Sequence, residues 1–93
     1  MNNKLIGKVE SMTSSNGNKV ANQFIITNES TRIFQSYDTI IAVKYNDGVL
    51  YLDSEKWNYS KTTSKYRNQF TRLTTDETKK AIKDGKIKLV NLN

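Results

Sequence analysis

Histidine and cysteine are both missing from the 93 residues. Without cysteine there is no disulfide and no thiolate metal site, and without histidine the commonest metal ligand and near-neutral acid or base is lacking. Catalysis of the Ser-His-Asp or Cys-His type is therefore excluded. The acidic residues show no spacing typical of a two-carboxylate site, and no glycine pattern of the nucleotide-binding kind is present. We expect no enzymatic activity, no metal and no cofactor.

Long apolar runs are absent as well, so no segment of the sequence has the length and character of a membrane-spanning helix. Residues 1–7 are too short and too polar to act as a signal peptide. We therefore predict a cytoplasmic protein that makes no contact with a membrane.

Positive charge is concentrated in the last third of the chain. The net charge is +6, yet residues 1–60 carry six basic and six acidic residues. The whole excess comes from residues 61–93, where nine basic residues are accompanied by only three acidic ones. Such asymmetry is typical of proteins that bind a polyanion, most often nucleic acid. The alternative is a lysine-rich surface that only keeps a small protein soluble.

The stretch of residues 57–73 has the periodicity of an amphipathic helix, and Ser60 within it is a suitable N-cap because its hydroxyl can accept from a free backbone N–H. One face carries aromatic and aliphatic side chains, those of Tyr59, Tyr66, Phe70 and Leu73. The opposite face carries the basic residues Lys61, Lys65 and Arg72. We predict that the aromatic face packs on the rest of the protein and the basic face is exposed.

A second helix is predicted to follow almost at once. Thr74 and Glu77 have the spacing of a capping box, and Gly85 is a suitable stop. The helical pattern places Thr78, Ala81 and Ile82 on the inward face, and Lys79 and Lys83 on the outward face.

These two helices supply the candidate binding residues. The basic candidates for nucleic-acid contact are Lys61, Lys65, Arg67, Arg72, Lys79 and Lys83. The aromatic candidates for stacking on unpaired bases are Trp57, Tyr59 and Tyr66. An alternative exists for each group. The aromatic side chains can instead fill the core of a small domain, and Arg67 can pair with Asp53 or Glu55 of its own chain.

Strand patterns separated by turn residues occupy the middle of the chain. Residues 24–27 and 31–35 flank a turn at 28–30, and residues 39–45 and 49–52 flank the hairpin sequence Asn46-Asp47-Gly48. Residues 87–90 supply a last strand. We predict an α+β fold, an antiparallel sheet of four to five strands with two short helices packed on one face.

The beginning of the chain has a weaker pattern. Residues 4–9 have the composition of a short strand, whereas residues 11–19 are polar, rich in serine and asparagine, and without periodicity. We therefore expect residues 1–20 to form an N-terminal strand and a flexible polar arm, and residues 21–93 to form a single α+β domain.

Three segments of the sequence resemble a family of small phage proteins of uncharacterised function. They are Phe34-Gln35-Ser36-Tyr37-Asp38, residues 60–70 with the distinctive run Thr-Thr-Ser-Lys-Tyr-Arg-Asn-Gln-Phe, and the closing Leu89-Val90-Asn91-Leu92-Asn93. The resemblance extends over about residues 22–93. It implies an origin in a phage or another mobile element, and it brings no catalytic residues with it.

Two functions of different class follow from these observations. In the first, the protein binds nucleic acid or a nucleoprotein effector complex of the host, as a host-defence inhibitor of the anti-CRISPR type that engages a guide RNA or its channel in the host cytoplasm. In the second, it is a protein–protein module that blocks or regulates a host protein without touching nucleic acid. Salt distinguishes the two, because phosphate contacts weaken steeply as salt rises whereas apolar contacts do not.

Overall fold

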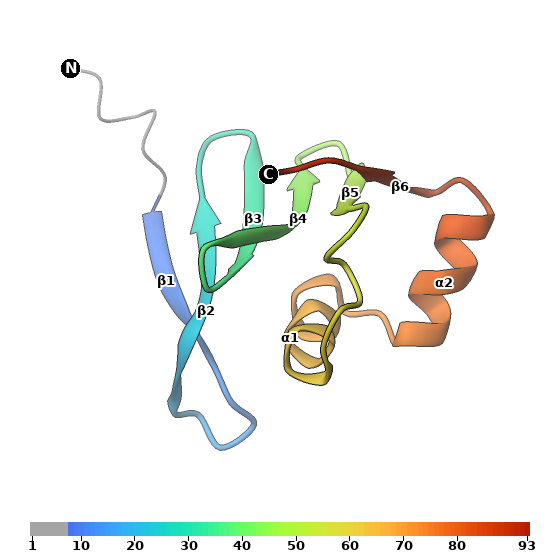
Figure 1. The fold of residues 1–93 in the computed structure, drawn as a ribbon. Helices are drawn as coiled ribbons and strands as arrows, with labels where there is room; N and C mark the ends of the chain where they lie inside the picture. Colours follow the sequence, from blue (N-terminus) through green and yellow to red (C-terminus); the bar gives the residue numbers. More distant parts are fainter. Residues whose placement is uncertain (1–7) are drawn as a thin grey trace.

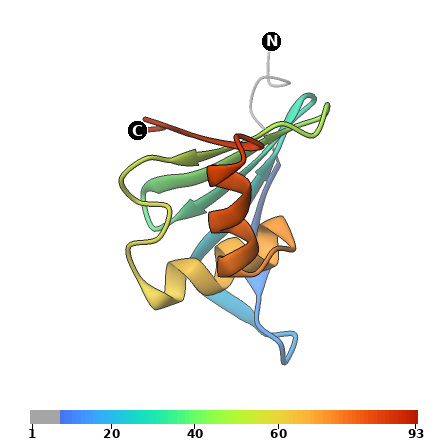
Figure 2. The same ribbon diagram turned by 90° about the vertical axis from the view of Figure 1, so that its right-hand side faces the viewer.

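The computed structural model describes residues 8–93, which form one mixed sheet and two helices (Figure 1). The elements in chain order are β1 (Lys8–Thr13), β2 (Lys19–Thr27), β3 (Thr31–Ser36), β4 (Thr39–Tyr45), β5 (Leu50–Asp53), α1 (Lys61–Thr71), α2 (Thr75–Lys83) and β6 (Ile87–Val90). The strands lie in the sheet in the same order as in the sequence. Both helices lie on one face of this sheet, as predicted (Figure 2).

The sheet differs from the prediction in its size and in one of its pairings. It has six strands in the described residues instead of four to five, and β6 runs parallel to β5, with Leu50 opposite Ile87. The chain leaves the end of β5 at Asp53, passes through both helices and returns to the opposite end of the sheet, where β5 begins. A parallel pair requires a long crossover of this kind, whereas the other neighbouring strands are joined by turns and are antiparallel.

The polar segment 11–19, for which the sequence predicts a loop, contains the end of β1, a turn and the start of β2. Within this hairpin Ser11 lies opposite Phe24, and Val9 lies opposite Ile26. The Ser14 N–H donates to the Asn18 carbonyl oxygen at 2.8 Å and closes the turn. Backbone pairing with β2 satisfies the N–H and C=O groups of a segment whose own strand pattern is weak. Residues 4–7 of the predicted first strand lie outside the described residues.

The core lies between the sheet and the helices. Phe34 of β3 is fully buried and stacks on Phe70 of α1, with 6.0 Å between the ring centroids. Its neighbours across the sheet are Ala42 and, one strand further, Leu52, both fully buried. Tyr66 joins them from α1. These contacts decide which side of α1 faces the sheet.

The other face of the sheet has no helix over it in the described part of the chain (Figures 1 and 2). Since side chains alternate along a strand, the residues that alternate with the Phe34 row point away from the helices. Cross-strand neighbours form a continuous row on this face, which we call the open-face row: Val9, Ile26, Ile33, Val43, Tyr51 and Lys88. Five of its six members are uncharged, and the single lysine lies at the β6 edge.

None of the helices in residues 8–93 is long and apolar enough to cross a membrane.

Candidate nucleic-acid interface

The two helices begin where the sequence predicts. The Ser60 hydroxyl accepts from the Thr63 N–H at 3.1 Å. The capping box of α2 is confirmed in both directions, because the Thr74 hydroxyl accepts from the Glu77 N–H at 3.1 Å and the Glu77 carboxylate accepts from the Thr74 N–H at 2.8 Å. These caps fix where each helix begins and give partners to backbone N–H groups of its first turn.

Four of the predicted basic residues are exposed on the helices, and a fifth lies at the corner between them. Lys61 and Lys65 extend from α1, and Lys79 and Lys83 extend from α2. The sequence places Arg72 on the same helical face as Lys61, and this is wrong. Arg72 is the C-cap of α1, with φ of 64°, so the helix ends there and its side chain leaves from the turn.

The relative direction of the two helices also differs from expectation. In the sequence, the short turn at Leu73-Thr74 predicts that the two basic faces can lie side by side. In the structure α2 instead crosses α1 steeply (Figures 1 and 2). The exposed cations are therefore arranged around a corner. We call the five residues Lys61, Lys65, Arg72, Lys79 and Lys83 the corner cations.

Arg67, the sixth basic candidate, is fully buried. Its Nη1 donates to the Trp57 carbonyl oxygen at 2.6 Å and to Asn58 Oδ1 at 3.2 Å. Its Nη2 donates to Asn68 Oδ1 at 2.8 Å and to Thr75 Oγ1 at 3.0 Å. The guanidinium thus joins the loop before α1, α1 itself and the first residue of α2. Its Nε has no hydrogen-bond partner but is buried, so no part of the guanidinium is accessible to an external phosphate.

The surroundings of Arg67 are neutral. Pairing with Asp53 or Glu55, the alternative that the sequence offers, does not occur, and its partners are oxygens of amide, hydroxyl and carbonyl groups. The guanidinium also lies over the Trp57 ring, 5.1 Å from the centroid. Burial lowers the pKa of Arg67 from its ordinary value because the charged form loses water. Arg67 therefore organises the fold around the site.

The three aromatic candidates occupy different environments. Tyr66 is buried, only 5 % exposed, and its ring packs in the core. Trp57 is half-buried beneath the Arg67 guanidinium. The sequence places Tyr59 on the inward face of the helix, but Tyr59 precedes the N-cap and is 47 % exposed, with the Lys56 ammonium 5.3 Å from its ring centroid. Of the three, Tyr59 is the one whose ring is open to a ligand.

Ion pairs in residues 8–93 leave the corner cations without acidic partners. Two pairs lie within 4.0 Å in this part of the chain, Lys8 with Glu10 at 3.9 Å and Lys80 with Asp84 at 3.3 Å. Neither includes a corner cation. The positive charge of the corner cations is therefore not compensated by a neighbouring carboxylate, and it is available to an anion from outside.

Several residues that hold the site together carried no recognisable signal in the sequence. Asn58 and Thr75 become important only because the fold brings them to Arg67. Asp53 has a similar role at the other end of the loop. Its carboxylate accepts from the backbone N–H groups of Lys56 at 2.9 Å and Leu92 at 2.8 Å, and from the Asn93 side chain at 3.1 Å. Partners so far apart in the sequence cannot be recognised from the spacing of neighbouring residues.

Comparison with known proteins places this fold in a family. Residues 7–88, most of the chain, match the family of unknown function DUF8033. The chain belongs to the DUF8033 family. This agrees with the resemblance to proteins of uncharacterised function, and the DUF8033 match extends into the β1–β2 hairpin. No curated protein and no solved structure matches the chain.

Proposed function

We propose that this protein binds nucleic acid, or a ribonucleoprotein, through the corner cations. The observation that carries the proposal is that four exposed basic side chains lie on two consecutive helices and a fifth lies in the turn between them, while neither ion pair of residues 8–93 involves any of the five. Phosphate groups can replace their counterions, and the released ions favour binding at low salt. Tyr59 lies just before α1 and offers an exposed ring for an unpaired base.

The shape of the site favours a strand that bends or a folded RNA over a straight duplex. Lys61 and Lys65 belong to α1, Lys79 and Lys83 belong to α2, and Arg72 lies in the turn between the two helices. The two helices cross steeply (Figure 2). Contacts to both helices at once require a backbone that turns the corner. In the phage setting that the sequence resemblance implies, we propose a guide RNA within a host effector complex, which the protein would inhibit.

A double charge reversal tests this proposal. The test variant carries Lys61→Glu and Lys65→Glu, and the control variant carries Lys19→Glu and Lys88→Glu. The control makes an equal change of net charge at exposed residues of β2 and β6. Binding to fluorescently labelled single-stranded RNA, single-stranded DNA and duplex DNA is measured by anisotropy over a range of salt concentrations. We expect the first variant alone to weaken binding by roughly tenfold or more and to lower the salt slope by about 1.5.

The melting temperature should stay nearly constant in both variants because the changed residues are exposed. Equal weakening by the two variants would mean that binding responds to net charge and that no basic site exists. If the unmodified protein binds none of the three nucleic acids at low salt, the proposal is wrong for free nucleic acid, and a second function takes its place.

The second function is a protein–protein module that blocks or regulates a host protein through the open-face row. The observation that favours it is the composition of the row, in which five cross-strand neighbours are uncharged and Val9 is 58 % exposed. A contiguous apolar surface of this kind is typical of interaction sites. A partner bound there should be retained when salt is raised, in contrast to a partner bound by the corner cations.

A further inference from the structure

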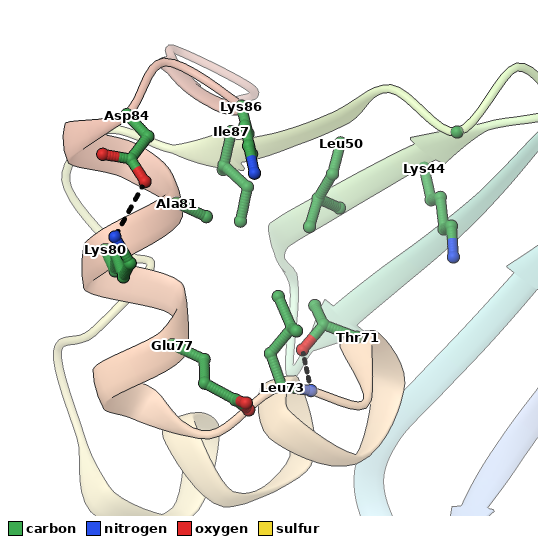
Figure 3. A pocket seen from close by; sticks show the side chains of 11 residues that line it. Lys44, Leu50, Thr71, Leu73, Glu77, Lys80, Ala81, Asp84, Lys86 and Ile87 are labelled. Atoms are coloured by element: carbon green, nitrogen blue, oxygen red, sulfur yellow. Dashed lines mark hydrogen bonds and ion pairs between the residues drawn. The ribbon is translucent and has the colours of Figure 1, made fainter.

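A cleft lies between the β4–β5 hairpin, the end of α1 and the inner side of α2 (Figure 3). It has a volume of about 450 Å³, within the range of roughly 300–1,000 Å³ that small-molecule sites occupy. Its apolar wall is built by Leu50, Leu73, Ala81 and Ile87, whose side chains converge on the same space in Figure 3. Neither the corner cations nor the open-face row belongs to it.

Positively charged side chains outnumber negatively charged ones at the rim of the cleft. Both of its carboxylates already have partners in the chain, because Asp84 pairs with Lys80 at 3.3 Å and Glu77 accepts from the Thr74 N–H at 2.8 Å. Two lysines of the rim, Lys44 of β4 and Lys86 before β6, take part in neither ion pair of residues 8–93. The lining thus holds three lysines and two carboxylates, so the net charge at the cleft is positive, and it lies beside an apolar wall.

We propose that this cleft binds a small amphipathic carboxylate, with the apolar body against Leu50, Leu73 and Ala81 and the carboxylate between Lys44 and Lys86. Burial of the apolar body supplies most of the affinity, and the two ammonium groups select for a negative head group. The proposal is independent of nucleic-acid binding, because it rests on residues that the corner cations do not include.

A series of ligands with the same chain and different head groups tests the proposal. Octanoate, octanol and octylammonium are titrated below their aggregation limits into the full-length, uniformly ¹⁵N-labelled protein, and amide shifts are followed by NMR. We expect octanoate to shift the amides of Gly48, Leu50, Ala81 and Ile87. Octanol should bind about three- to tenfold more weakly, and octylammonium more weakly still.

Variants test separately how the lysine charges and the apolar space of the cleft contribute to ligand binding. The double variant with Lys44→Gln and Lys86→Gln should bind octanoate no more tightly than octanol. The control with Lys19→Gln and Lys88→Gln removes equal charge away from the cleft, and it should keep the preference for octanoate over octanol. Ala81→Leu should fill part of the apolar space and abolish the cleft shifts, with a melting curve confirming that the variant is folded. The proposal is overturned if the three head groups bind equally, if the shifts map to the open-face row, or if octanoate causes no shifts.

Discussion

The two faces of the sheet differ in both cover and charge. One face lies under α1 and α2, and its central residues, such as Phe34 and Leu52, are fully buried. The other carries the open-face row, which is apolar except for Lys88 at the edge. The corner cations all belong to the helical side. A polyanion bound to the corner cations and an apolar partner bound to the open-face row would therefore contact opposite sides of the molecule. Substitutions on one side need not disturb binding on the other.

The same contrast exists within α1. Its inner side is formed by Tyr66, Arg67 and Phe70, each buried and in contact with the sheet, the preceding loop or α2. Its outer side presents Lys61 and Lys65 to solvent. Substitutions on the inner side should therefore change the free energy of unfolding, and those on the outer side should change binding. The predictions below test this division, beginning with the largest effect.

Phe70→Ala should break the contact between the helical layer and the sheet. The ring is 5 % exposed and stacks on Phe34, so its removal leaves a cavity and should lower the free energy of unfolding by about 3–5 kcal/mol. For a domain of this size that is a large part of the total stability. Thermal melting checks this. An unchanged melting temperature together with lost binding would mean that Phe70 contacts a partner instead of the core.

Arg67→Met should be the next most damaging change. Methionine can fill much of the same space, but it cannot donate to Trp57, Asn58, Asn68 and Thr75. The Asn58 and Thr75 oxygens keep other donors, Ser64 Oγ and Asn68 Nδ2, whereas the Trp57 carbonyl oxygen and Asn68 Oδ1 lose theirs. Each partly buried acceptor left without a donor costs about 1–3 kcal/mol, so we expect a loss of at least about 2 kcal/mol in urea unfolding. Arg67→Lys should rescue little, because one ammonium cannot reproduce the planar fork. If Arg67→Met weakens nucleic-acid binding without a change in stability, Arg67 is a contact residue.

The parts of the fold that local chemistry determines could be predicted from the sequence. Ser60 and Thr74 cap the helices as predicted, because a cap depends on residues three positions away. The strands β4 and β6 have the predicted bounds, because their runs of β-branched residues end at turn residues. The α+β class follows from the same patterns.

Features that depend on distant contacts could not be predicted. β1 is a strand because β2 pairs with it, and β6 is parallel to β5 because two helices separate them in the chain. In the candidate site, helical periodicity places Lys61 on the exposed face, but it does not show that Arg67 is fully buried. The burial of Arg67 depends on Trp57 and Thr75, which only the folded chain brings to its guanidinium.

Asp53→Asn should have a moderate, pH-dependent effect. Desolvation by burial raises the pKa of Asp53, but hydrogen bonds from Leu92, Lys56, Asn93 and Glu55 outweigh it, so the pKa lies below the usual aspartate range. A carboxyl with a lowered folded-state pKa stabilises the protein above its unfolded pKa of about 3.9, and this contribution is lost as pH falls through the folded pKa. We expect a loss of roughly 1.5 kcal/mol at neutral pH.

Urea unfolding at several pH values checks this expectation. The difference between the two proteins should be constant from about pH 5 to 7. It should shrink below about pH 4, where Asp53 becomes protonated in the unfolded state, and continue to shrink until the pH falls below the lowered folded-state pKa. A difference that persists undiminished at low pH would show that the geometry of the side chain, and not its charge, is responsible.

Arg72→Gly should have the smallest effect on stability, and in the opposite direction. Arg72 ends α1 with a positive φ of 64°, a conformation in which glycine has no steric penalty, whereas a side chain raises the energy. Glycine also has more conformational entropy in the unfolded chain, which opposes this gain, so we expect a net stabilisation of at most about 1 kcal/mol. The same change removes one of the corner cations and should lower the salt slope of nucleic-acid binding by about 0.7–0.9. Higher stability together with weaker binding would separate the structural and binding roles of a single residue. Weaker binding with an unchanged salt slope would instead mean that Arg72 contacts no phosphate and does not belong to the site.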